Sequence, residues 1–352
     1  MRSVFFYTIK TSNKVIMNKK WILPVTTALL ILASIWICHN VLSVKSPHGI
    51  NQARAFYHQP LDSLDVLCVG SSHVHCGINT GELWDDYGIA AYDFSAAEQT
   101  LWETYHYLIE AYKYQHPKVV ILDVFSVARF REDYHYHWME ESFFGLKPSY
   151  NKYQMLKVSA EKENFKNYMP AFLTYHSRYV DLNKEDLYNV FGGHLEKKTF
   201  KGYTPGFIVA DQSDPFGGWD ELDDYGLTAK SELYLKKIIN LVKSEGSELK
   251  IIVVPYNLDE RDRITYADIE KICSEEDISF INYNDFLDDI GIDKATDFND
   301  HTHLNYWGSV KFSNFLGSEI KKEYDIIDRR NDKKYSSWDE NAENIRKTAE
   351  KR

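Results

Sequence analysis

The chain has 352 residues, of which 44% are hydrophobic, 26% charged and 15% aromatic. This balance excludes an intrinsically disordered chain, a collagen-like fibre and a small disulfide-stapled scaffold. Lys and Arg total 41 and Asp and Glu total 52, which gives a net charge of −11. Because proteins bind nucleic acids through clustered basic side chains, a chain this acidic is not expected to bind them.

The first predicted element is a membrane-spanning helix. From Trp21 to Val44 the sequence WILPVTTALLILASIWICHNVLSV contains no Lys, Arg, Asp or Glu. About 20 apolar residues in a helix span the hydrocarbon core of a bilayer, so residues 21–44 are long enough. The alternative is a cleaved signal peptide, whose apolar region is usually about 7–15 residues and ends at a small-residue cleavage site. No Ala-x-Ala motif follows here, which favours an uncleaved anchor.

Basic residues around this run indicate its orientation. Only Lys45 and Arg54 follow it closely, whereas the basic residues that precede it are Arg2, Lys10, Lys14, Lys19 and Lys20. By the positive-inside rule, residues 1–20 are expected to form a cytoplasmic tail. The sequence therefore predicts a single-pass membrane protein whose main body lies outside the cytoplasm.

The body of the chain alternates short apolar runs with helical patterns. Strands are predicted at Asp65–Val69, Ile89–Phe94, Val119–Val124, Lys250–Val254 and Ile278–Asn282. Helices are predicted over residues 98–115, 227–244, 260–275 and 306–323. Strands separated by helices of this length pair in parallel through right-handed crossovers. The expected fold is therefore α/β, a three-layer α/β/α sandwich around a parallel sheet.

Residues 63–327 are predicted to form one domain, interrupted by an insertion at about 128–227. The insertion is rich in aromatic residues and glycine, and we expect loops and short helices there. In it, Lys197, Lys198 and Lys201 are predicted to lie in a solvated loop. Residues 45–62 read as a polar linker, and residues 328–352 as a charged tail with marginal structure.

The first candidate catalytic segment follows the first strand, in VGSSHVHCGIN at residues 69–79. Gly70 permits a sharp turn, and Ser71 and Ser72 follow it at the carboxyl end of the strand, where open α/β sheets bind ligands. A serine hydroxyl becomes a nucleophile when a nearby base accepts its proton. The alternative interpretation is a polar turn in which serine only caps the next helix.

A candidate base lies near the other end of the chain, in DFNDHTHLNYWG at residues 297–308. Asp300 and His303 are three positions apart just before the last helix of the domain. This spacing lets the carboxylate orient one imidazole nitrogen while the other nitrogen faces a serine. Serine, histidine and aspartate together predict nucleophilic acyl chemistry.

At these residues the chain resembles the SGNH/GDSL hydrolase superfamily. G-S-S at 70–72 stands where that family has G-D-S, and D-x-x-H-L-N-x-x-G at 300–308 stands where it carries its last block. The resemblance covers about residues 62–125 and 230–325. It implies a flavodoxin-like parallel sheet, Ser72 as nucleophile, and Asp300 and His303 as its triad partners, with no cofactor and no metal.

Within the superfamily, the chain is most similar to membrane-anchored acyl-transfer proteins of bacterial envelopes. These include the protein that D-alanylates teichoic acid and the partners of membrane-bound O-acyltransferases. The resemblance therefore implies a membrane-bound O-acyltransferase as the acyl donor and a cell-envelope glycan as the acceptor.

The chain departs from the family in two blocks that help to bind the oxyanion. YDFSAAEQT after the second strand has no glycine, and VVILDVFSV at the third strand has no Asn. We expect the backbone N–H groups of Ser72 and of Ser95 or Ala96 to bind the oxyanion instead. Further side chains expected at the substrate are His73, Asp123, His176 and Arg178. For Arg178 the structural alternative is burial against a carboxylate.

Three H-x-H pairs leave two other interpretations open. His73/His75 or His301/His303, with Asp300, have the ligand types of a zinc site. His135/His137 lie among Tyr134, Tyr136 and Trp138, which predicts either a sugar-stacking platform or a loop that packs its aromatic rings on the body.

The function expected from these features is acyl transfer, most simply of acetyl, onto a cell-envelope glycan outside the membrane. The first alternative is an esterase with the same triad, in which water accepts the acyl group. The second alternative is a silent glycan-binding subunit that retains the fold, which the missing glycine and asparagine favour. The retained Ser72, Asp300 and His303 favour an enzyme.

Overall fold

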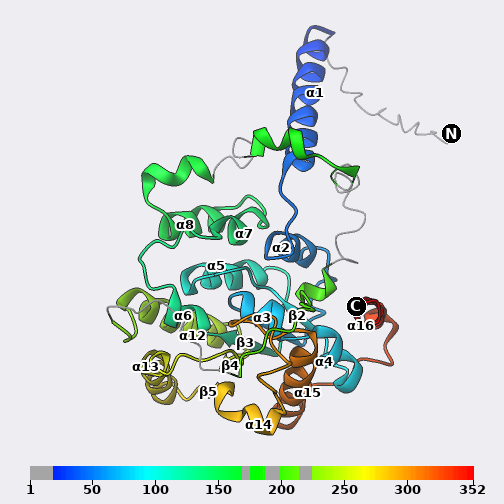
Figure 1. The fold of residues 1–352 in the computed structure, drawn as a ribbon. Helices are drawn as coiled ribbons and strands as arrows, with labels where there is room; N and C mark the ends of the chain where they lie inside the picture. Colours follow the sequence, from blue (N-terminus) through cyan, green and yellow to red (C-terminus); the bar gives the residue numbers. More distant parts are fainter. Residues whose placement is uncertain (1–18, 169–174, 185, 187–198, 214–223) are drawn as a thin grey trace, which may run out of the picture.

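The computed structural model describes residues 19–168, 175–184, 186, 199–213 and 224–352 (Figure 1). The predicted cytoplasmic tail lies outside these residues except at its end. The α-helices are α1 Lys19–Leu42, α2 Ile50–Phe56, α3 Ser72–Gly77, α4 Thr80–Tyr87, α5 Leu101–Ala111, α6 Phe125–Arg129, α7 Met139–Phe144, α8 Tyr150–Ser159, α12 Ala229–Ser244, α13 Asp262–Glu275, α14 Leu287–Ile290, α15 Tyr306–Glu323 and α16 Ser336–Ala349. Short 3-10 helices are η1 Lys162–Asn167, η2 His176–Asp181, η4 Phe200–Gly202, η5 Tyr283–Phe286 and η6 Lys333–Tyr335.

A five-stranded sheet forms the centre of the protein. Its strands are β1 Val66–Val69, β2 Ala91–Asp93, β3 Val119–Asp123, β4 Glu248–Val253 and β5 Ser279–Asn282. Every neighbouring pair is parallel, and the order is β2-β1-β3-β4-β5. The predicted mixed α/β architecture with a parallel sheet is thereby confirmed. The order reverses between β1 and β3, and in doubly wound sheets such a switch point is where ligands bind, outside the carboxyl ends of the strands.

Helices cover both faces of this sheet. Along β1, Leu67 and Val69 join the buried cluster that includes side chains of α5 and α12, whereas Val66 and Cys68 join the cluster that includes side chains of α4 and α15. Side chains alternate between the faces of a strand, so the fully apolar sequence of β1 is explained by burial on both faces.

Helix α1 stands apart from the body (Figure 1). The most apolar 18-residue stretch within Lys20–Leu42 has a mean hydropathy of 2.1, and none of that stretch is buried within the protein. It is the one helix in the described residues that is long and apolar enough to cross a membrane. The predicted apolar helix is therefore confirmed, while its orientation remains a prediction.

The segments predicted as a polar linker and as a charged, marginally structured tail each contain a packed helix. The predicted linker contains α2, where Phe56 is fully buried and stacks on Phe94 at 4.1 Å between ring centroids. The predicted charged tail contains α16, where Trp338 is fully buried and its indole N–H donates to the carbonyl of Ala91 at 3.1 Å. In both helices a few apolar residues at helical spacing find a hydrophobic surface, which charge content alone does not reveal.

The predicted insertion holds α7, α8 and the short helices η1, η2 and η4 in its described parts. Lys201 is not in a solvated loop: its side chain is buried, donates to Gln59 Oε1 at 2.7 Å and to Ser337 Oγ at 2.8 Å, and lies 3.9 Å from the centre of the Trp338 ring. Lys197 and Lys198 lie outside the described residues.

Candidate active site

The serine turn lies at the switch point of the sheet, directly after β1. Gly70 has φ +147°, and a Cβ there would come within 2.9 Å of the carbonyl oxygen of Asp123 on β3. Only glycine fits this close approach without strain. Ser71 follows as the buried N-cap residue of α3, and Ser72 is the first residue of α3 and is part-exposed. The turn therefore buries one serine and presents the other.

The loop before α15 carries the histidine to this turn. Asn305 caps α15 by accepting the N–H of Gly308 at 3.0 Å, and its amide donates to the carbonyl of Thr296 at 2.7 Å. A bridge between Phe298 and Leu304 closes the loop. Within it, His303 Nε2 lies 2.7 Å from Ser72 Oγ. The predicted proximity of these two residues is confirmed, while their catalytic roles remain predictions.

Asp300 orients the other side of the imidazole. Its Oδ1 and Oδ2 lie 3.0 and 3.1 Å from His303 Nδ1, so Nδ1 carries the proton and Nε2 is free to accept one from Ser72. Oδ1 also accepts the N–H of Thr302 at 2.9 Å and its hydroxyl at 2.8 Å. Burial raises the pKa of Asp300, but the bonds from His303 and Thr302 outweigh it and hold this pKa well below its usual range. The carboxylate therefore stays charged.

Beneath the triad lies a fully enclosed imidazole, His73. Its ring stacks on Phe125 at 3.5 Å between centroids and lies 5.5 Å from the Tyr256 ring and 5.2 Å from that of His303. Burial, with a smaller effect of the charge of His303, lowers the pKa of His73 well below its ordinary value. Since His73 is only 1% exposed, it packs under His303 as a neutral ring and is not placed to contact a substrate.

The expected oxyanion donors come from α3 and from the loop after β2. Ser72 is at the first position of α3, where backbone N–H groups have no partner within the helix. Ser95 and Ala96 are buried, and the Ser95 hydroxyl lies 3.0 Å from His75 Nδ1. His75 thus turns away from the triad and supports the loop that carries Ser95.

The structure corrects two other predicted substrate contacts. Asp123 is fully buried at the end of β3, and its carboxylate accepts the N–H groups of Val254 at 3.0 Å and Phe125 at 3.3 Å. Burial raises its pKa to about 7, although these bonds lower it. Asp123 therefore joins β3 to β4 and does not face a substrate.

Arg178 is the second residue that does not lie at the predicted place. It is paired with a carboxylate, which is the structural alternative stated for it. Its guanidinium donates to Asp186 Oδ1 at 2.8 Å and to carbonyl oxygens at the end of α1. Arg178 thus lies at the foot of the apolar helix and is not a partner of the triad. The side chain of His176, the remaining predicted contact, lies outside the described part of the chain.

The histidine pairs do not converge on a metal site. Among the described residues no three His, Cys, Asp or Glu side chains are grouped to hold an ion. His135 Nε2 and His137 Nδ1 both contact Glu98 Oε2, at 2.7 and 2.8 Å. Trp138 packs edge-on against the His48 ring with centroids 5.5 Å apart. The loop thus contacts the body through Glu98 and His48, while Tyr134 and Trp138 keep 37% and 40% of their surface exposed.

Thr302 and Asn299 also belong to the site, and neither was predicted from the sequence. Thr302 Oγ1 lies 2.6 Å from His303 Nδ1, and the Asn299 amide donates to Asp300 Oδ2 at 3.2 Å. A signal for Thr302 exists, because an aspartate commonly accepts the N–H two residues further on in a turn. Asn299 has no comparable local signal.

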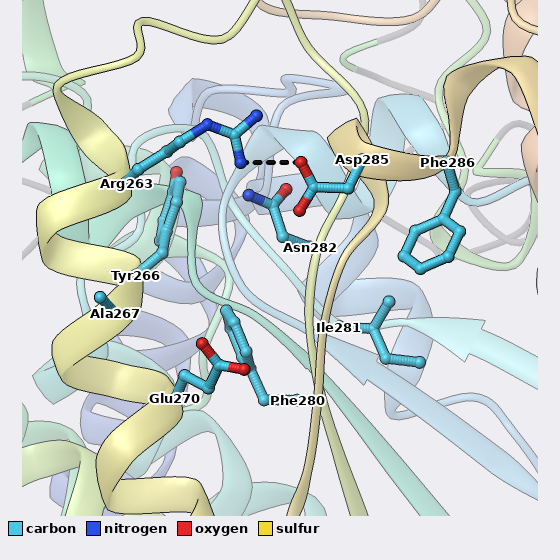
Figure 2. A pocket seen from close by; sticks show the side chains of 9 residues that line it. All are labelled: Arg263, Tyr266, Ala267, Glu270, Phe280, Ile281, Asn282, Asp285 and Phe286. Atoms are coloured by element: carbon cyan, nitrogen blue, oxygen red, sulfur yellow. Dashed lines mark hydrogen bonds and ion pairs between the residues drawn. The ribbon is translucent and has the colours of Figure 1, made fainter.

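A cavity of about 410 Å³ lies away from the triad, between α13 and the edge strand β5 (Figure 2). Its lining residues include Tyr266, Phe280 and Asn282, and an ion pair between Arg263 and Asp285 at 2.7 Å spans one end. Two of its charged lining residues, Arg263 and Asp285, are thus paired with each other, and the third, Glu270, lies on α13.

Comparison with known proteins adds no assignment. No protein-family model matches the chain, and no curated protein sequence matches it significantly. The function must therefore be argued from the site.

Proposed function

We propose that the chain is a membrane-anchored serine acyltransferase of the SGNH/GDSL type that O-acylates a cell-envelope glycan outside the cytoplasm. The observation that carries this proposal is the contact of 2.7 Å between Ser72 Oγ and His303 Nε2, with Asp300 on the far side of the imidazole. The strand order and the position of the serine at the switch point support the three-layer α/β/α sandwich with a flavodoxin-like sheet that this superfamily has.

In the proposed reaction Ser72 Oγ attacks the carbonyl carbon of a donor ester while His303 Nε2 takes its proton. The oxyanion forms next to the backbone N–H groups expected from Ser72 and from Ser95 or Ala96. Its collapse breaks the ester bond, and His303 returns the proton to the departing alcohol. A glycan hydroxyl then attacks the acyl-serine with His303 again as base, which restores Ser72.

The position of the site near the end of α1 supports a donor supplied from the membrane. His48 follows the last residue of α1 by only six positions, a stretch that spans at most about 22 Å. Its ring lies 6.2 Å from that of His75 on α3, the helix that begins with Ser72. A membrane-bound O-acyltransferase in the same bilayer is therefore the partner that we propose as donor.

An assay with an acyl-ester donor and an envelope glycan tests this proposal. The full-length protein in lipid nanodiscs should place the acyl group on sugar hydroxyls, and Ser72→Ala should abolish the transfer. Release of free acid alone, at the same rate with and without glycan, would identify an esterase. If neither product formed with any donor and serine-directed probes failed to label Ser72, the silent glycan-binding subunit would replace the proposal.

A further inference from the structure

The last turn of α1 marks the level at which this helix would leave a membrane. From Trp21 to Cys38 its residues are exposed, whereas His39 to Leu42 are half-buried against the body of the protein. The exposed stretch is about 27 Å long at 1.5 Å per residue, close to the ~30 Å thickness of a bilayer core. The half-buried turn thus falls at the depth of the lipid headgroups.

Three charged side chains hold this turn, and together we call them the junction clamp: Lys45, Arg178 and Asp186. Lys45 Nζ and Arg178 Nη2 each lie 2.8 Å from Asp186 Oδ1. The same two cations donate to carbonyl oxygens at and just after the C-terminus of α1, those of Asn40, Val41, Leu42 and Ser43. Burial raises the pKa of Asp186, but Lys45 and the N–H of Asn183 more than offset this, so its pKa falls to about 2. The clamp is therefore charged at neutral pH.

Helix η2 carries Arg178 and presents apolar side chains on its outer side. Tyr179, Val180 and Leu182, here called the η2 patch, are 68%, 69% and 40% exposed. The 3-10 helix contacts α1, and in Figure 1 it lies against the lower end of α1. An exposed apolar cluster next to a lipid-facing helix is unfavourable in water and favourable in a membrane interface, where tyrosine is also enriched.

We propose that the η2 patch is a second membrane contact, seated in the headgroup region of the bilayer beside α1 and held there by the junction clamp. This inference rests on the membrane anchor of the proposed function. Lipid is the occupant because the patch lies on a 3-10 helix that contacts α1, and α1 carries a long apolar surface that is not buried within the protein.

Two membrane contacts would fix the orientation of the body relative to the membrane. A single helix leaves the body free to swivel about the helix axis, whereas a clamped helix and a second contact beside it do not. The carboxyl-terminal end of the sheet, beside which Ser72 lies, is then held at one height and one angle above the bilayer. That constraint suits an enzyme that takes its acyl group from a membrane protein.

Photo-crosslinking in the full-length protein tests the η2 patch directly. Benzoylphenylalanine would replace Val180, and the protein would be placed in nanodiscs of phosphatidylcholine and phosphatidylglycerol. Ile264, which is 54% exposed on α13, gives a matched exposed position away from α1. We expect lipid adducts at position 180 to exceed those at position 264 several-fold, as detected by mass spectrometry. Equal adducts at the two positions would overturn the inference.

A position on α1 separates this inference from the proposed anchor. Leu30 is 69% exposed, and the same reporter there should form lipid adducts if α1 spans the bilayer. Lipid adducts at 30 without adducts at 180 would refute the η2 contact alone, and their absence at both positions would refute the anchor too. Because the reporter reads lipid contact, the experiment works equally in the Ser72→Ala variant and is independent of acyl transfer.

Two further experiments serve as controls. One tests whether the loss of lipid adducts comes from lost contact and not from misfolding, and the other tests whether the η2 patch binds lipid or a protein. Val180→Asp, with the reporter at Tyr179, should lower the lipid adducts several-fold, whereas Val180→Leu should keep them; equal adducts in both variants would contradict the inference. In native membranes the reporter at position 180 should still label lipid. A protein adduct that replaces the lipid adduct would show that the η2 patch is a protein interface and would overturn the proposal.

Discussion

Ser72 and His303 are 231 positions apart in the sequence, and their Oγ and Nε2 atoms lie 2.7 Å apart. Ser71, next to Ser72, is fully buried at the N-cap position of α3. The turn after β1 thus separates the roles of two adjacent serines by exposure alone. The first prediction follows from this difference.

Ser72→Ala should lower acyl transfer by at least about a thousandfold, since loss of a triad member removes the catalytic unit as a whole. Ser71→Ala should keep a substantial fraction of the activity, because that hydroxyl lies inside the turn. His303→Ala should match Ser72→Ala. Turnover of an acyl ester and labelling by a fluorophosphonate probe measure both effects. An inactive Ser71→Ala together with an active Ser72→Ala would show that Ser71, not Ser72, is the nucleophile.

Asp300→Asn should reduce kcat by between about a hundredfold and ten-thousandfold, and by no more than Ser72→Ala does. The physical reason is that the amide no longer stabilises the imidazolium and favours the wrong tautomer of His303. Full activity of Asp300→Asn in the same ester assay would show that the carboxylate does not serve the reaction.

Thr302 should act as a positioning residue for this pair. Thr302→Val keeps the shape of the side chain but removes the hydroxyl that donates to Asp300 Oδ1 at 2.8 Å. A hydrogen bond to a charged group contributes about 1.5–3 kcal/mol, so kcat/KM should fall by between about tenfold and a hundredfold. Thr302→Ser should restore most of the loss, and a failure of this rescue would point to packing instead.

The buried His73 should make stability depend on pH. Its pKa is lowered in the folded protein, so below about pH 6.5 the unfolded chain takes up a proton that the folded chain does not. Stability is therefore lost as the pH falls. In His73→Phe, the difference in unfolding free energy between pH 7.5 and 5.5 should shrink by about 1 kcal/mol. The groups whose charge reaches His73 are His303, Asp300, His75 and His301, and they are unchanged in the variant.

Denaturant titrations at the two pH values measure this effect. Phenylalanine keeps a ring on the face of Phe125, so the comparison isolates the titration from the packing. An unchanged pH dependence in His73→Phe would contradict the neutral buried state of His73.

Helix α16 should contribute strongly to stability. Trp338→Ala would leave a cavity where a fully buried indole packs, at an expected cost of about 3–5 kcal/mol in unfolding free energy. Trp307 is 44% exposed, and Trp307→Ala should cost less than about 1 kcal/mol. Equal effects of the two substitutions would mean that α16 is not docked in solution.

Local patterns determined much of this protein from the sequence alone. The apolar run of α1, the five strands and the crossover helices α5, α12 and α13 are predicted from hydrophobicity and its period, which depend on neighbouring residues. The serine turn and the D-x-x-H turn are equally local. The start of α5 was harder to predict, because Glu98 has φ +50° and the helix begins only after Thr100.

Tertiary structure decided which side chains face the site and which hold the fold. Asp123 and Arg178 have the chemistry of substrate ligands, yet their partners are Val254 and Asp186, residues that no local pattern pairs with them. Likewise, α16 is stable because a hydrophobic surface far away in the sequence receives Trp338. Burial and ion pairing depend on contacts between distant segments, so only the folded chain determines them.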